Sequence, residues 1–129
     1  MSRMLFLSFA TLIALGVGTA ATLFPAALLE SKGVAPTAAT CLWMREVGVM
    51  LLAMGVIFVR VRTQPDSPTV RALMAGNLLI QLGLLGVEVA GYAKGVIPLL
   101  SGILPNAILH VVLALGFGWL WIAPPAPPR

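Results

Sequence analysis

The sequence predicts an all-α fold: an integral membrane bundle of four helices with both termini on the cytoplasmic side (N-in, C-in). Hydrophobic residues make up 60% of the 129-residue chain, and charged residues make up only 9%. The apolar residues fall into four long blocks, and the mean hydropathy is +1.04. A soluble domain of this length needs more charge to cover its surface. Blocks of roughly 22 to 26 residues can each cross a hydrocarbon core of ~30 Å at ~1.5 Å per residue. We therefore interpret residues 1–129 as a single membrane domain.

The first block predicts a membrane helix over residues 4–29. A basic start, an apolar run and small residues at 19–21 also occur in cleaved signal peptides. The apolar run continues past those small residues to Leu29. We therefore interpret the block as a retained helix, bent near Pro25.

The second and third helices are predicted at residues 37–61 and 68–93. Thr37 suits the N-cap of one, and Ser67 followed by Pro68 suits the start of the other. Each helix also carries two glycines seven residues apart, Gly48 and Gly55 in one and Gly76 and Gly83 in the other. Glycines at this interval let two helix backbones approach closely. We therefore expect these two helices to form the tightest pair of the bundle.

The fourth block predicts a helix over residues 97–122, with a proline inside it. Either Pro98 opens one long helix that is kinked at Pro105, or the helix begins at Pro105 after a short interfacial segment. We favour the kinked helix. Residues 123–129 form a proline-stiffened tail that cannot continue it.

Basic residues set the predicted orientation. One side of the bundle would carry Arg3, Arg60, Arg62, Arg71 and Arg129, and the other would carry Lys32 and Lys94. Cytoplasmic loops are enriched in Lys and Arg, so five residues against two favour cytoplasmic termini. These residues are seven of the eight Lys and Arg that, against four Asp and Glu, give the net charge of +4. We therefore expect membrane lipids, and no nucleic acid, as partners.

Polar residues inside the predicted helices form one candidate cluster. Its members are Arg45, Glu46, Asn77, Gln81, Glu88, Asn106 and His110. The three on the third helix share one face, because they are spaced i, i+4 and i+11. Polar groups that face lipid lack hydrogen-bond partners, so this face should turn toward other helices. The predicted orientation places the four ionisable members in the outer half to the middle of the bilayer.

Pairing is the expected remedy for a buried charge, which costs roughly 2.5–3.5 kcal/mol near the centre of a membrane helix. We expect Arg45 to pair with Glu88, and Glu46 to meet His110 or a partner chain. The cluster is then a structural network that clamps three helices, or a ligand, proton or cofactor site open to the outer side. In a third interpretation, Arg45 and Glu46 simply reach the membrane interface.

The sequence carries no catalytic motif and no metal site. Its one cysteine, Cys41, excludes an intrachain disulfide, and its one histidine excludes a Cys/His zinc cluster or a pair of axial haem ligands within one chain. Neither a phosphate-binding loop nor a dinucleotide fingerprint nor a nucleophile elbow is present. We therefore predict no catalysis and no resident cofactor. A lipid, quinone or pigment ligand at His110 stays open.

The stretch MREVGVMLLAMGVIFVRVR, with Arg45 three residues before Gly48, resembles a helix of the small DoxX-like bacterial membrane proteins. A later histidine in an apolar run, at Leu109-His110-Val111-Val112, adds to the resemblance. The resemblance covers all four helices in outline. It implies a multi-pass protein of the bacterial cytoplasmic (inner) membrane, linked to quinone-dependent sulfur oxidation or to larger redox assemblies. It also implies that Arg45 and His110 face a ligand.

Three functions compete. We favour a non-catalytic accessory subunit that packs against a larger membrane complex or against itself as a homo-oligomer, because short loops and glycine-lined faces suit that role. The alternative is a protein that binds a small hydrophobic or quinone-like ligand at the outer polar cluster. A small dimeric transporter is the third. Four-helix drug exporters place an essential carboxylate in their first helix, and the first helix here has none.

Overall fold

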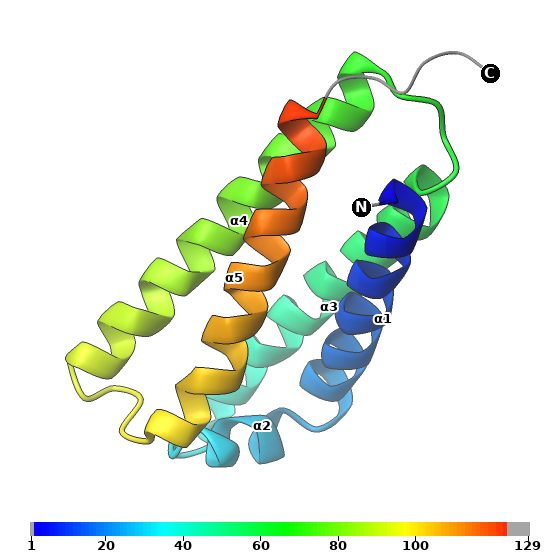
Figure 1. Cartoon of the computed structure of the whole chain (residues 1–129). Helices are drawn as coiled ribbons and strands as arrows, with labels where there is room; N and C mark the ends of the chain where they lie inside the picture. Colours follow the sequence, from blue (N-terminus) through cyan, green and yellow to red (C-terminus); the bar gives the residue numbers. More distant parts are fainter. Residues whose placement is uncertain (1, 124–129) are drawn as a thin grey trace.

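The computed structural model describes residues 2–123, which fold into helices joined by short connections (Figure 1). In chain order these are α1 (Arg3–Leu23), α2 (Pro25–Ser31), α3 (Ala38–Val61), α4 (Pro68–Ala93) and α5 (Leu100–Ile122). The four long helices are each apolar enough and long enough to cross a membrane, whereas α2 has only seven residues. The prediction of an all-α bundle with four membrane-length helices is therefore confirmed. The first residues of α1 and the last of α5 lie at the same end of the bundle. The predicted tail, apart from Ala123, lies outside the described residues.

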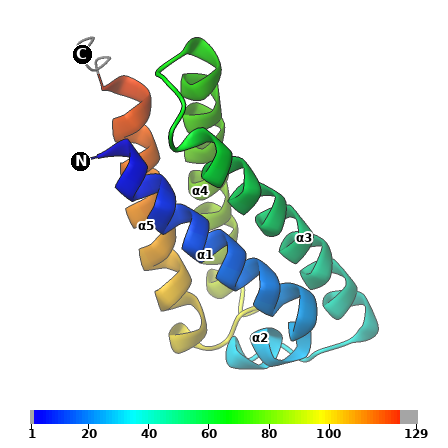
Figure 2. The ribbon, with the colours of Figure 1, turned by 90° about the vertical axis from the view of Figure 1, so that its right-hand side faces the viewer.

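The first predicted helix is divided in two. Phe24 leaves the helical conformation, with φ −126° and ψ 49°, and Pro25 begins α2. Proline lacks a backbone N–H and disfavours helical geometry in the residue before it, so the chain turns here. The sequence located the bend, but a continuous helix over 4–29 was wrong. The short α2 lies across the end of the bundle opposite the termini (Figure 2).

The last helix runs through its proline, as predicted, because Pro105 lies within α5. The alternative of a helix beginning at that proline is therefore excluded. Its start is later than the predicted residue 97, since Pro98 and Leu99 remain extended or irregular. The predicted starts of α3 and α4 are confirmed. Thr37 accepts a hydrogen bond from the Thr40 amide at 3.1 Å, and Ser67 accepts one from the Val70 amide at 3.3 Å.

The helices pack as two pairs, α1 with α3 and α4 with α5 (Figure 2). The α1–α3 contact uses both predicted glycines of α3. A Cβ atom at Gly48 would lie 2.9 Å from the Gly18 carbonyl, and one at Gly55 would lie 2.6 Å from Leu15 Cδ2. In contrast, a Cβ at Gly76 or Gly83 would have no such neighbour within 4 Å.

The predicted α3–α4 pair was therefore wrong. Glycine spacing identifies a face that can approach another backbone, but it does not identify the helix that supplies that backbone. Gly18 of α1 meets the glycine face of α3, because a Cβ there would lie 3.0 Å from the Gly48 carbonyl.

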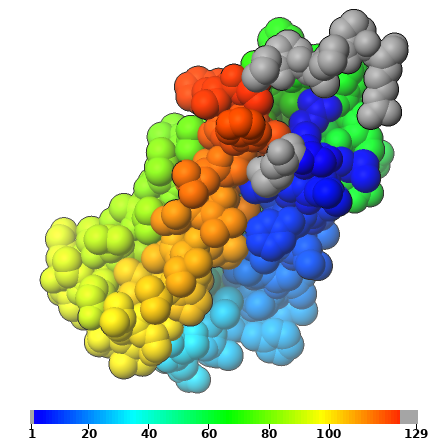
Figure 3. Space-filling view, viewed as in Figure 1, coloured from blue at the N-terminus to red at the C-terminus, as the bar shows by residue number. Residues whose placement is uncertain are grey.

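The apolar core lies near the end that carries the termini. It consists of Phe6, Leu7, Ala10, Ala14, Phe58, Met74, Leu113 and Phe117. Phe117 is fully buried and stacks edge-on against Phe6, with ring centroids 5.0 Å apart. Gly116 allows this approach, because a side chain there would overlap the Phe6 ring. In the space-filling view, α5 occupies the surface between α4 and α1 (Figure 3). A polar cluster around Glu88 lies toward the other end.

Candidate functional site

Glu88 is the centre of a polar cluster at the end of the bundle opposite the termini. Its Oε1 atom accepts hydrogen bonds from Lys32 Nζ at 3.0 Å and from Asn106 Nδ2 at 2.8 Å. Lys32 caps the C-terminus of α2, Glu88 lies near the end of α4, and Asn106 lies in the second turn of α5. One carboxylate oxygen therefore joins three helices.

His110 extends this cluster toward the middle of α5. Its Nδ1 lies 2.7 Å from Gln81 Oε1, and Gln81 is buried on α4. An amide oxygen only accepts, so Nδ1 carries the proton in this arrangement. The other ring nitrogen, Nε2, lies 4.0 Å from Glu88 Oε2. That carboxylate oxygen is buried and is the one such side-chain atom among residues 2–123 without a hydrogen-bond partner.

Lys32 reaches Glu88 because the C-terminal end of α2 lies against α5 at one point. The close approach occurs at Gly102, where a Cβ atom would lie 2.5 Å from the Lys32 Cα. The Lys32 ammonium also donates to the Gly102 carbonyl at 3.2 Å. Neither residue was predicted to belong to the cluster. The glycine near the start of the last helix was the available signal, but the sequence did not reveal that α2 folds back onto it.

The structure brings together four of the seven predicted cluster residues: Gln81, Glu88, Asn106 and His110. Asn77 is buried on the same helix, but its amide donates to the Leu73 carbonyl of its own helix at 2.8 Å. It lines an apolar groove instead.

Arg45 and Glu46 lie apart from the cluster, exposed on the surface of α3. The predicted Arg45–Glu88 pair was wrong, and so was a contact between Glu46 and His110 within one chain. The reason is the helix pairing: α3 packs on α1, while Lys32 of α2 takes the place beside Glu88. Across residues 2–123, no salt bridge or side-chain hydrogen bond involves Arg45 or Glu46. A contact of Glu46 with a partner chain stays a prediction.

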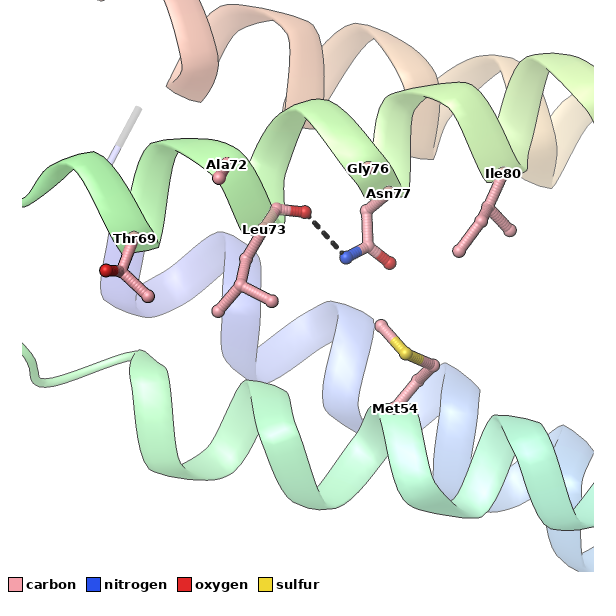
Figure 4. Close-up of a pocket in the computed structure, with 7 residues that line it drawn as sticks. All are labelled: Met54, Thr69, Ala72, Leu73, Gly76, Asn77 and Ile80. Carbon is pink, nitrogen blue, oxygen red and sulfur yellow. Dashed lines mark hydrogen bonds between the residues drawn. The ribbon is translucent and has the colours of Figure 1, made fainter.

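A groove of about 370 Å³ separates α3 from α4 (Figure 4). Met54 lines it from α3, and α4 supplies Thr69, Ala72, Leu73, Gly76, Asn77 and Ile80. The groove exists because these consecutive helices belong to different pairs. A second groove of about 400 Å³ lies along α4 and α5 beside Trp119. Neither groove reaches Glu88 or His110.

A second charged network lies at the end of the bundle that carries the termini. Asp66, in the α3–α4 connection, accepts from Arg71 Nη2 at 2.7 Å and lies 3.8 Å from Arg3. The hydrogen bond from Arg71 lowers the pKa of the Asp66 carboxyl below its usual value. Arg71 also donates to the Ala123 carbonyl at 2.9 Å, so the network joins α4 to the end of α5.

These features define a small all-α protein whose four long helices can cross a membrane and enclose a polar cluster near one end. Within the described part of the chain, no three His, Cys, Asp or Glu side chains come together as metal ligands. Comparison of the sequence with protein-family models and curated proteins, and of the fold with solved structures, gave no match.

Proposed function

We propose that the protein is a non-catalytic accessory subunit that associates laterally, within the membrane, with a larger complex or with copies of itself. The observation that supports this most directly is the exposed charge on α3. Arg45 and Glu46 lie on a membrane-length helix and have no partner among residues 2–123. Charged groups within membrane helices normally pair or face a protein interior. A neighbouring protein would supply the missing partners.

The shape of the bundle supports the same proposal. Only 17% of the most apolar window of α3, and of α4, is buried within the chain. The groove between them is lined mainly by apolar and small residues and is open on the outside. Small residues and shallow grooves are features that membrane helices use for close packing with other helices.

The polar cluster then serves a structural role. The Glu88 carboxylate accepts hydrogen bonds from Lys32 and Asn106. Gln81 forms a hydrogen bond with the His110 ring on the neighbouring helix. Such a network fixes how α2, α4 and α5 sit against one another. Hydrogen bonds between membrane helices contribute about 0.6 kcal/mol on average.

A second candidate function is binding of a small hydrophobic or quinone-like ligand, as the resemblance to DoxX-like proteins would imply. One observation favours it: Glu88 Oε2 is buried without a hydrogen-bond donor, 4.0 Å from His110 Nε2. A hydroxyl group of a ligand could donate to that oxygen. The other residue that the resemblance marks as ligand-facing, Arg45, lies outside this cluster.

We further propose that the membrane is the bacterial cytoplasmic membrane, with both termini inside. The end that carries the termini holds Arg3, Arg62 and Arg71, whereas Lys32 and Lys94 lie at the other end. This asymmetry follows the enrichment of basic residues in cytoplasmic loops.

Isolation of the tagged chain from its own membranes in mild detergent tests both candidates. An accessory subunit should copurify with a partner in fixed stoichiometry, either another protein or further copies, as measured by native mass spectrometry. A ligand-binding protein should instead appear as one chain with a bound small molecule, and Glu88→Gln should lose that molecule. A bare single chain would contradict both proposals.

A further inference from the structure

We propose that a second copy of this chain packs against the outer face of α3, in a parallel two-fold arrangement that pairs Arg45 of each copy with Glu46 of the other. The outer face is defined by Leu42, Arg45, Glu46, Val49 and Val56. This inference rests on the proposed function, because it names a second copy as the protein that associates laterally with this chain in the membrane.

The apolar residues of the outer face form a stripe that nothing in the described chain covers. Leu42, Val49 and Val56 are 54%, 56% and 57% exposed. They are seven residues apart, so they follow one line along the helix, as in the contact seam of paired helices. The buried residues of α3 are Gly48, Gly55 and Phe58, and the first two face α1. The stripe therefore remains available after the bundle has formed.

Arg45 and Glu46 flank this stripe on opposite sides. Successive helix residues differ by ~100° in direction, and the line through Leu42 and Val49 passes between these two. Both side chains are exposed. The stripe therefore carries a positive group on one flank and a negative group on the other, at nearly the same height.

The depth of Glu46 in the membrane calls for a partner. The 24 residues of α3 span ~36 Å, against a hydrocarbon core of ~30 Å. If the core is centred on α3, Arg45 and Glu46 lie roughly 7–9 Å inside it. A long arginine side chain can extend from this depth to the interface. The shorter glutamate side chain cannot, so Glu46 requires a donor at its own depth.

A second copy supplies that donor by symmetry. In a parallel two-fold pair, the flank with Arg45 on one helix faces the flank with Glu46 on the other, and the axis repeats the contact. The two residues are adjacent, so their depths differ by only ~1.5 Å. An antiparallel pair would separate the charges along the membrane normal. A different protein would have to present both a carboxylate and a guanidinium or ammonium group here.

Charge reversal in lipid bilayers tests the pairing. The full chain is reconstituted at low density, and energy transfer between labelled copies measures association. Arg45→Glu places two acidic groups on each copy, and Glu46→Arg places two basic groups there. Each variant alone should associate at least about tenfold more weakly, since like charges then face one another. A mixture of the two variants, and the double variant R45E/E46R alone, should both regain association. Thermal unfolding in detergent checks that each variant folds.

Cross-linking tests the geometry independently. On a Cys41→Ser background, Val49→Cys places a thiol near the proposed axis, where oxidation by copper–phenanthroline should link two copies. A disulfide requires Cα atoms within about 7 Å of each other. The control is Leu79→Cys on α4, where the native side chain is 71% exposed. It should remain unlinked.

The outcomes separate this inference from the proposed function. Unchanged association of both single variants, or a mixture that fails to regain it, would show that these charges do not pair across a dimer. A chain that is monomeric in bilayers but holds a different subunit in fixed stoichiometry would contradict the second copy and leave the accessory role intact. A chain that associates with neither would contradict both.

Discussion

The side chains of Lys32 and Glu88 form an ion pair of 3.0 Å although 56 positions separate them in the sequence. Lys32 ends the short helix that crosses the end of the bundle, and Glu88 belongs to α4. Each side chain is only 15% exposed. The pair therefore fixes α2 in a place where neither charge is well solvated by water.

Removing one partner should destabilise the fold more than removing both. We expect Glu88→Gln and Lys32→Met each to lower the free energy of unfolding by about 2–3 kcal/mol, because each leaves the charge of the remaining residue without its opposite charge. The double variant should lose less than the sum of the two. Denaturation of all three variants in mixed detergent measures this.

Lys94→Met is the matched control for that experiment. Lys94 is exposed at the C-terminus of α4 and makes no salt bridge in the described chain. Its loss should change stability by less than about 0.5 kcal/mol. Strictly additive effects of the Lys32 and Glu88 substitutions would mean that their charges do not interact.

Sequence reasoning located the depth of the polar residues better than their direction. Hydropathy and spacing correctly placed Glu88 and His110 between one end of the bundle and its middle, because depth follows from position along a helix of known pitch. The partner of Glu88 depends on which helix lies beside it. That arrangement follows from packing across the whole bundle, so Arg45 was chosen where the fold supplies Lys32.

The glycines show the same difference: their spacing reveals a helix face, but not the helix that packs against it. A larger side chain at Gly48 should force α1 and α3 apart, because the Thr22 amide nitrogen would lie 2.8 Å from even a Cβ atom. Gly48→Leu should therefore destabilise the protein by about 1–3 kcal/mol. Gly83→Leu on α4 should have little effect, since no such neighbour lies within 4 Å. Unfolding in detergent compares the two, and equal losses would contradict the observed helix pairing.

The orientation of the chain is a separate prediction, because it depends on the membrane. We expect the α3–α4 connection to be cytoplasmic and the α4–α5 connection to face outward. On a Cys41→Ser background, Thr63→Cys should react with an impermeant maleimide only after the cells are permeabilised, whereas Lys94→Cys should react in intact cells. Both positions are exposed. The reverse pattern would invert the orientation.

The charged network of Asp66, Arg71 and Arg3, at the end that carries the termini, predicts a dependence of stability on pH. The hydrogen bond from Arg71 lowers the pKa of Asp66 in the folded chain, and the nearby charges of Arg71 and Arg3 add to this effect. A carboxyl group with a lowered pKa stabilises the folded state above its unfolded pKa, which is near 3.9 for aspartate. That stabilisation is lost as the pH falls through the folded value.

Asp66→Asn isolates this contribution from the other carboxylates. At neutral pH the variant should unfold at a lower temperature than the wild type, because it lacks the charge that attracts Arg71 and Arg3. The difference should stay constant down to about pH 4 and then shrink. Thermal unfolding in detergent across this range measures it. A difference that is the same at pH 3 and pH 7 would show that the aspartate acts through its shape and hydrogen bonds alone.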